Sequence, residues 1–160
     1  MARTHHYLLT TTWTGNLGSG TSGYRSYSRN HKINSAGWAT PLSLSSDPVF
    51  RGDNTRTSPE QLLLASLSSC HMLWVLHLCA DSGIVVTAYE DNAEGVMQEN
   101  EDGSGNFTGV VLRPRVQITE GGRSGELDEI HHKAHELCFI SRSVNFPVQW
   151  EPVVLHGTAA

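Results

Sequence analysis

A long apolar segment with a helix start and a helix stop constrains this chain more than any other feature. Ser58-Pro59-Glu60 supplies an N-cap residue, a proline suited to the first helical position and an acid in the first turn. The segment ends at about Ser82-Gly83, where the glycine suits a C-terminal cap. Because the residues between are apolar on nearly all sides, we expect the buried central helix of the fold.

The same segment is a poor candidate for a membrane span. Its apolar stretch, Leu62–Ala80, is interrupted by serines and by His71 and His77, which favours a buried helix of a soluble protein. The first residues, Met1–Tyr7, lack the apolar core and cleavage site of a secretory signal. We therefore expect no membrane partner and a cytoplasmic location, where thiols stay reduced.

Stretches with β-strand character lie on both sides of this helix. Those before it are short and moderately polar: His6–Trp13, Tyr24–Ser28 and Ala39–Leu44. Those after it are longer: Ile84–Met97, Phe107–Thr119 and Pro147–Val154. The polar, glycine-containing run Gln98–Asn106 predicts an exposed hairpin loop between two long antiparallel strands.

A second, shorter helix is expected over residues 126–139, because acids cluster near its start. The order strands, long helix, strands, short helix, strand contains more hairpins than strand–helix–strand units. It predicts an α+β fold with mainly antiparallel sheets packed on the central helix. A chain of 160 residues without an internal repeat fits a single domain, residues 1–160.

Charge and cysteine content exclude several classes of function. A formal net charge of −5, with scattered Lys and Arg, gives no basic stripe, so a nucleic-acid partner is not expected. The three cysteines, Cys70, Cys79 and Cys138, are too few for a disulfide scaffold and contain no Cys-x-x-Cys pair. Catalysis or burial must therefore explain them.

Cys70 is a candidate nucleophile that needs a cation. Only a thiolate attacks a peroxide, and a free cysteine with a pKa of about 8.5 is mostly protonated at neutral pH. Cys70 lies ten residues after Glu60, about 15 Å along a helix, where the helix dipole no longer acts. Arg51 and Arg25 are the candidate partners, Arg51 being favoured, and Glu60 could orient such an arginine.

These residues also carry a family resemblance. The run Ser58–Leu62 reads Ser-Pro-Glu-Gln-Leu, and Cys70 follows ten residues after the glutamate. This pattern, together with Ala134–Cys138, resembles the OsmC/Ohr family, whose order of elements the chain follows. The resemblance implies an intertwined homodimer with active sites at the subunit interface. There a Cys70 thiolate, paired with an arginine that Glu60 holds, would reduce organic hydroperoxides and also hydrogen peroxide.

The resemblance further implies a catalytic cycle. The Cys70 thiolate attacks the O–O bond, and Cys138 captures the resulting sulfenic acid as a disulfide. An external dithiol, such as a lipoylated protein, then reduces the disulfide, and no bound cofactor is required. The chain has His71 and Phe139 where better-studied branches place Phe and Pro, so it resembles a less characterised OsmC-like branch.

Two other cysteine and histidine positions have simpler interpretations. Successive residues of a helix point about 100° apart, so His71 need not face the pocket of Cys70. Cys79, nine residues beyond Cys70, falls on the opposite side of the helix and is assigned to packing.

Three alternative functions remain open. A metal site could use His131, His135 and Cys138, which line one helical face, with His71 or water as a fourth ligand. A hydrolase could use Cys70 or Ser69 as its nucleophile, although no Gly-x-Ser-x-Gly motif is present.

The third alternative is a dimeric protein that binds an apolar ligand without turning it over. Trp74, Phe50 and Phe146 would wall its pocket. Such a protein would tolerate the loss of the Cys70 thiol.

Overall fold

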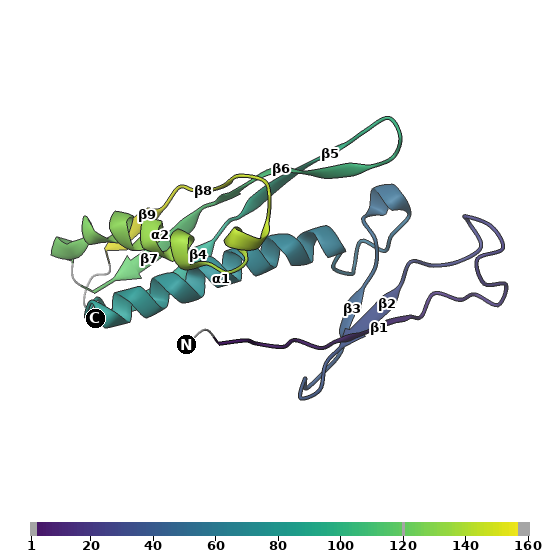
Figure 1. Cartoon of the computed structure of the whole chain (residues 1–160), viewed down its shortest axis with the longest axis horizontal. Coiled ribbons are helices and arrows are strands. Elements are labelled where there is room, and N and C mark those ends of the chain that lie inside the picture. Colours follow the sequence, from purple (N-terminus) through teal and green to yellow (C-terminus); the bar gives the residue numbers. More distant parts are fainter. Residues whose placement is uncertain (1–2, 120, 157–160) are drawn as a thin grey trace. The chain divides into compact units, whose positions relative to one another are not determined.

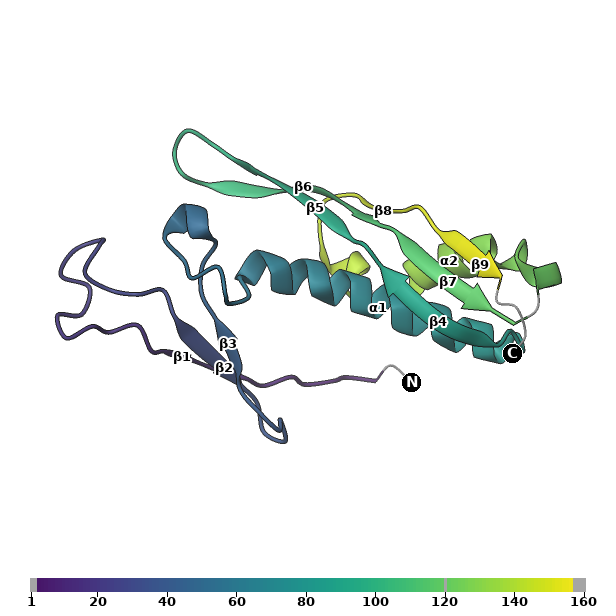
Figure 2. The same cartoon turned by 180° about the vertical axis from the view of Figure 1, so that it is seen from behind.

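The structure, a computed structural model, describes residues 3–119 and 121–156. The chain forms two compact units, residues 1–62 and 63–160. Helix α1, Pro59–Asp81, begins at the end of the first unit and runs into the second. Figures 1 and 2 show the elements from opposite sides.

The first unit contains an antiparallel sheet with strand order β1-β2-β3. Its strands are short: β1 Thr10–Trp13, β2 His31–Asn34 and β3 Leu42–Leu44. A single turn of 3-10 helix, η1 (Pro48–Phe50), follows, and the Asp47 carboxylate accepts a hydrogen bond from the Val49 amide at its start. The predicted strands around residues 10–13 and 42–44 are confirmed.

The strand predicted over Tyr24–Ser28 is wrong, and β2 takes its place in the sheet. Residues 24–27 form turns and bends, and Ser28 has no regular secondary structure. The loop before β2 folds back because the Trp13 Nε1 donates to the Ser28 carbonyl (2.8 Å) and the Ser28 amide donates to the Gly15 carbonyl (2.9 Å). Residues held in this way cannot also form a sheet ladder.

The ends of α1 agree closely with the prediction. At its start the Ser58 hydroxyl accepts from the Gln61 amide, while the Ser58 amide donates to the Gln61 side chain, which is a reciprocal cap. At its end Gly83 adopts a φ of 70°. The Gly83 amide bonds the Ala80 carbonyl and the Ile84 amide bonds the Cys79 carbonyl, which is a Schellman cap.

The second unit contains two mixed sheets, β4-β7-β9 and β5-β6-β8. The first comprises β4 Val86–Asp91, β7 Pro114–Ile118 and β9 Val153–His156. The second comprises β5 Glu94–Glu99, β6 Gly105–Leu112 and β8 Val148–Trp150. Pairs β4·β7 and β5·β6 are antiparallel, whereas β6·β8 and β7·β9 are parallel. The α+β class is therefore confirmed.

Each long strand predicted for this unit is divided into two. Asp91 sits at the first break, where its carboxylate accepts from the Arg113 amide at 2.7 Å. Arg113 is the residue between β6 and β7. Its guanidinium binds Glu94, the first residue of β5, at 2.9 Å and Glu151, the residue after β8, at 3.1 Å. Pro152, which has no amide hydrogen to donate to a ladder, follows the last of these. The chain thus passes from one sheet to the other.

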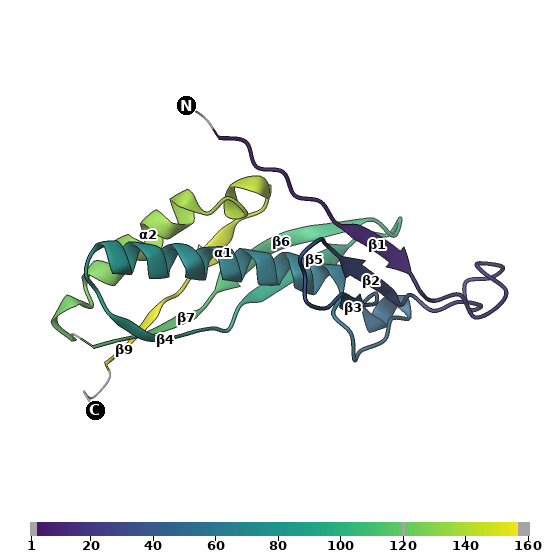
Figure 3. The same ribbon diagram turned by 90° about the horizontal axis from the view of Figure 1, so that it is seen from below.

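Helix α2, Glu126–Leu137, lies beside α1 (Figure 3). Single 3-10 turns precede and follow it: η2 Gly121–Arg123 and η3 Ser141–Ser143. Residues of both helices, of strand β7 and of the segment before β4 share one core cluster: Val75, Cys79, Ile84, Val116, Ile118, Leu127, Ile130 and Ala134. A second cluster surrounds Leu67, Val110, Leu112 and Val148.

The expectation that α1 is buried on nearly all sides is wrong for the single chain. Its buried residues form one stripe at four-residue spacing: Leu67, His71, Val75 and Cys79. Other apolar residues stay accessible, and Leu73 is 61% exposed. By length and mean hydropathy (1.7) α1 is also able to cross a membrane, a criterion that core helices of soluble proteins pass as well.

Candidate functional site

Two cysteine thiols meet where α1 and the end of α2 come together. Cys70 is half-buried in α1, and Cys138 is fully buried at the position that caps α2. The Cys138 side chain is close enough to the Cys70 thiol to raise its pKa. The second unit thus brings together the two cysteines proposed as a reacting pair, and it leaves Cys79 apart from them in the core.

Opposing effects act on the Cys70 thiol. Burial raises its pKa most, and interaction with the Cys138 side chain raises it further. The backbone amides of Ile140 and Phe139 lower the pKa, because their N–H groups stabilise the thiolate. The net shift is upward, so Cys70 needs a further cation before it becomes a good nucleophile at neutral pH.

The chain wraps tightly around Cys138. Its backbone leaves the helical conformation (φ −66°, ψ 109°), and its amide donates to the His135 carbonyl at 3.3 Å. The Cys138 Sγ accepts from the Ser141 amide at 3.4 Å. The Arg142 amide donates to the Cys138 carbonyl at 3.1 Å. This turn continues into η3. The amides of residues 139 and 140 within it lower the pKa of Cys70.

An apolar surface adjoins the two thiols. Trp74, one helical turn beyond Cys70, meets Phe139 edge to face with ring centroids 6.2 Å apart. A surface hollow of about 300 Å³ is lined by Leu73, Trp74 and His77. Phe139 is 69% exposed although it directly follows a buried cysteine. An apolar molecule could therefore rest beside Cys70.

The predicted aromatic wall is corrected in part. Phe146 does not line this hollow, because its ring packs against Phe107 at 5.5 Å within the second core cluster. Trp74 keeps its place, and Phe139 is an aromatic neighbour that was not anticipated. Phe50 belongs to η1 in the first unit.

His71 turns away from the thiol and into the core. Its Nε2 lies 3.0 Å from the Nδ1 of His131, and both side chains are fully buried. Burial lowers the pKa of each to about 4, and in His71 the nearby His131 adds to this effect. The outer nitrogens, His71 Nδ1 and His131 Nε2, have no hydrogen-bond partner among the described residues.

The predicted metal site is not formed within residues 3–119 and 121–156. No group of three or more His, Cys, Asp or Glu side chains there could hold a metal ion. His131 bonds to His71, His135 stacks on Trp150 with centroids 4.5 Å apart, and Cys138 contacts Cys70. Residues that share one face of α2 thus have three different partners.

The hydrolase interpretation gains no support from the described residues. Ser69 is exposed, and none of the described hydrogen bonds joins it to a histidine. His71, the nearest histidine in sequence, is committed to His131.

The other predicted site residues lie in the first unit. Arg25 is exposed in a turn, not on a strand, and Arg51 is exposed with a left-handed backbone (φ 65°). Glu60 occupies the first turn of α1. Its Oε2 is inaccessible to solvent and has no partner among the described residues, and a cation would satisfy such an acceptor.

Arg29 is a candidate that the sequence alone did not suggest. Its guanidinium lies 4.3 Å from the ring centres of both Tyr24 and Tyr27, and its Nη1 donates to the Tyr27 carbonyl at 2.9 Å. Its Nη2 is buried and has no partner in the described part of the chain. The Tyr-x-x-Tyr-x-Arg spacing was the available signal, since arginine stacks on tyrosine rings.

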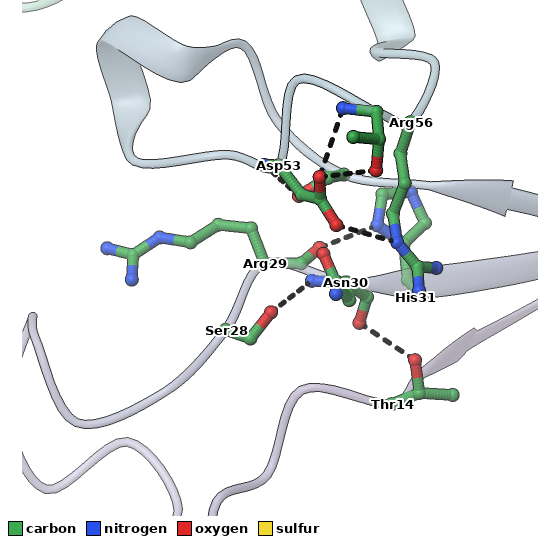
Figure 4. A network of polar contacts seen from close by, with 9 residues as sticks. Thr14, Ser28, Arg29, Asn30, His31, Asp53 and Arg56 are labelled. Atoms are coloured by element: carbon green, nitrogen blue, oxygen red, sulfur yellow. Dashed lines mark hydrogen bonds and ion pairs between the residues drawn. The ribbon is translucent and has the colours of Figure 1, made fainter.

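A polar network holds the backbone of Arg29 in place (Figure 4). The Asn30 amide donates to the Ser28 hydroxyl, and the Asn30 carbonyl accepts from the Thr14 hydroxyl. The His31 Nδ1 lies 2.9 Å from the Arg29 carbonyl. Figure 4 also shows the ion pair between Arg56 and Asp53 at 3.1 Å, which explains why Arg56 is not a free cation.

Comparison with known proteins decides the family. Residues 52–152, which include both cysteines of the pair, match the model of the OsmC-like protein family. The chain belongs to the OsmC-like protein family. The resemblance carried by the Ser58–Leu62 run and by Cys70 is thereby confirmed, and the OsmC-like family includes organic hydroperoxide resistance proteins.

Individual OsmC-like relatives match over nearly the whole chain. The Bacillus subtilis protein YmaD is 24% identical over 159 residues, covering 96% of this chain and 97% of YmaD. An OsmC-like protein of unknown function from Vibrio cholerae is 31% identical with a TM-score of 0.84, covering 94% of this chain and all of its own.

An organic hydroperoxide resistance protein from Legionella pneumophila has the same fold. It is 20% identical with a TM-score of 0.66, and the match covers 94% of this chain and 98% of the Legionella chain. At this identity the likeness concerns the OsmC-like fold alone.

Proposed function

We propose that this OsmC-like protein is a cysteine-based peroxidase that reduces organic hydroperoxides, with Cys70 as the attacking thiolate and Cys138 as the resolving thiol. The observation that carries the proposal is the proximity of the two thiols, since Cys138 is close enough to raise the pKa of Cys70. A sulfenic acid formed on Cys70 would need only a small movement to meet Cys138. The apolar surface of Trp74 and Phe139 favours the carbon chain of an organic hydroperoxide.

The proposed cycle has three balanced steps. The Cys70 thiolate attacks the outer oxygen of ROOH, the O–O bond breaks, and the leaving alkoxide takes a proton to become an alcohol. The Cys138 thiol then attacks the Cys70 sulfenic acid, which forms a disulfide and releases water. An external dithiol, such as a lipoylated protein, reduces this disulfide by thiol–disulfide exchange and is itself oxidised.

The cycle needs a cation beside Cys70, because the surroundings of that thiol raise its pKa. We propose Arg51 or Arg25 for this role, with Glu60 orienting the guanidinium, and add Arg29 as a third candidate. The unpartnered Oε2 of Glu60 supports its role as the orienting carboxylate, and the unpartnered Nη2 of Arg29 supports Arg29 as a candidate. Replacing the active arginine with lysine would keep the charge and lose the fork of donors.

A steady-state assay tests the proposal. Purified protein is mixed with cumene hydroperoxide and dihydrolipoamide, and peroxide consumption is followed. We expect turnover that disappears in Cys70→Ser and that is faster with cumene hydroperoxide than with hydrogen peroxide. Glutathione, a monothiol, serves as the matched control reductant. Equal consumption by wild type and Cys70→Ser would refute a peroxidase.

A non-catalytic ligand-binding protein is the second candidate function. The hollow lined by Leu73, Trp74 and His77 is the observation that favours it. Such a protein would bind an apolar ligand equally well after Cys70→Ser, and it would consume no peroxide. The assay above and a binding titration on the same variant separate the two candidates.

We further propose a homodimer in a reducing compartment such as the cytoplasm. Each chain leaves large apolar residues exposed on both units, including Tyr7 (90%), Leu8 (85%) and Leu73 (61%). A second copy of the chain could cover such residues. The three free cysteines and the need for a dithiol reductant favour a compartment that keeps thiols reduced.

A further inference from the structure

A buried histidine pair joins the two helices that carry the thiols. His71 follows Cys70 on α1, and His131 lies seven residues before Cys138 on α2. Their Nε2 and Nδ1 atoms are 3.0 Å apart, and the rings stack at an interplanar angle of 16°. Both side chains are fully buried, so water cannot replace this bond at either nitrogen.

Two apolar side chains in place of the histidines would fill the same space without burying unpartnered polar atoms. Each imidazole keeps one outer nitrogen without a partner in the described part of the chain, and such buried polar atoms destabilise a core. The neighbouring buried positions of the α1 stripe, Leu67, Val75 and Cys79, have no polar oxygen or nitrogen on their side chains. What the histidines add at this place is a bond with a fixed length and direction.

We propose that His71 and His131 are positioning residues, whose mutual hydrogen bond fixes the register of α1 against α2 and so holds Cys138 beside Cys70 for disulfide formation. This inference rests on the proposed roles of the two cysteines. It assigns a function to His71, which follows Cys70, and to His131 on the buried face of α2.

The demand for register comes from disulfide geometry. A disulfide tolerates only a narrow range of Cα separations, about 4.4–6.8 Å. A slip by one residue along a helix axis moves a side chain by about 1.5 Å and rotates it by about 100°. Apolar contacts between helices permit small slips, whereas a hydrogen bond between two buried rings does not.

Two double variants distinguish the effect of the hydrogen bond from the effect of side-chain volume. H71L/H131L keeps apolar bulk and removes both partners, a change that leaves no orphaned donor. H71Q/H131N keeps a bond, because a glutamine amide falls near the position of Nε2 and an asparagine amide near that of Nδ1. The readout is the effective concentration of the Cys70–Cys138 pair, measured at equilibrium in mixtures of reduced and oxidised glutathione, in a Cys79→Ala background.

This readout does not depend on peroxidase activity. Formation of the disulfide removes two electrons and two protons from the cysteines and converts one oxidised glutathione into two reduced molecules. We expect the effective concentration to fall by about tenfold or more in H71L/H131L and to stay within about threefold of wild type in H71Q/H131N. Circular dichroism confirms that each variant is folded.

Three results would overturn the proposal. They are an unchanged effective concentration in folded H71L/H131L, an equal loss in both double variants, and a wild type that forms no intramolecular disulfide in any glutathione mixture. If H71L/H131L does not fold, H71Q/H131L replaces it as the variant without the bond. Its effective concentration is then compared with that of H71Q/H131N, and an equal value would overturn the proposal. A wild type that forms the disulfide with glutathione but not with peroxide would refute the peroxidase alone.

Discussion

At the scale of single residues, the two thiols influence each other directly. The Cys138 side chain raises the pKa of Cys70, whereas the amides of Ile140 and Phe139 lower it. Cys138 therefore has two opposite effects in the proposed cycle. It raises the pKa of the attacking thiol. In the proposed cycle it also resolves the sulfenic acid.

This opposition predicts the effect of Cys138→Ala on ionisation. Removing the second thiol abolishes two of the interactions that raise the pKa of Cys70, so that pKa should fall. A pH titration of the ultraviolet thiolate absorbance, in a Cys79→Ala background, measures it. The Cys79→Ala protein with Cys138 intact is the control. A pKa that rises or stays constant would contradict the described contact.

The histidine pair predicts a loss of stability in mild acid. Burial lowers the pKa of His71 and His131 from 6.5 to about 4, so the unfolded chain binds these protons more readily. Stability should therefore fall as the pH drops from 6.5 towards 4, by about 2 kcal/mol per histidine between pH 7 and pH 5. Asp91 opposes the shift of His71, and His135 adds to it.

Urea denaturation at several pH values measures this loss. H71L/H131L is the matched control, because it keeps the carboxylates that also respond to acid. Its free energy of unfolding should change less between pH 7 and pH 5 than that of wild type. An equal change of the free energy of unfolding with pH in the two proteins would show that the histidines are not buried in the neutral form.

At the scale of elements, α1 shows what local sequence can predict. Its first and last turns are fixed by neighbours in the chain, Ser58 with Gln61 at one end and Gly83 with Ala80 at the other. Such caps involve residues only a few positions apart, so the sequence predicts both ends to within about two residues. The start of α2 at Glu126 was likewise marked by its local acids.

The cap at Gly83 can be tested by substitution. Its φ of 70° is costly for any residue with a Cβ, so Gly83→Ala should destabilise the protein by about 1 kcal/mol. Gly125→Ala is the control, because Gly125 has a φ of −64° and open space around its Cα. Thermal unfolding followed by circular dichroism compares them. Equal melting temperatures for the two variants would contradict the cap.

The strands show what local sequence cannot predict. Apolar periodicity indicated two long strands after α1, but each is divided where Asp91 and Arg113 bond across the sheets. The turn around residues 24–28 depends on the bond from Trp13 to Ser28, fifteen residues along the chain. Contacts between residues so distant in sequence leave no local pattern.

The residues of the candidate site also differ in whether the sequence could predict them. The two cysteines, Glu60, Arg51 and Arg25 were proposed from residue chemistry and family resemblance, whereas Arg29 was not. The pairing of His71 with His131 could not be predicted, since it depends on how two helices face each other. The spacing of His131, His135 and Cys138 instead left a metal site open as an alternative, and the described residues do not form one.

At the scale of the whole molecule, the exposure of α1 suggests a second copy. Only one stripe of this helix is buried within the chain. We predict that the protein is a dimer at micromolar concentration, with twice the chain mass of 17.5 kDa. Sedimentation velocity over a dilution series checks this. A single species with the mass of one chain would contradict a dimer.

The central claim is that Cys70 and Cys138 form one redox pair. Mass spectrometry after one equivalent of an organic hydroperoxide tests it most directly. Wild type should lose two hydrogens and yield a peptide link between Cys70 and Cys138, Cys138→Ser should carry added oxygen on Cys70, and Cys70→Ser should stay unchanged. A wild type that stays reduced while a small thiol in the same tube is oxidised, or a link through Cys79, would contradict the claim.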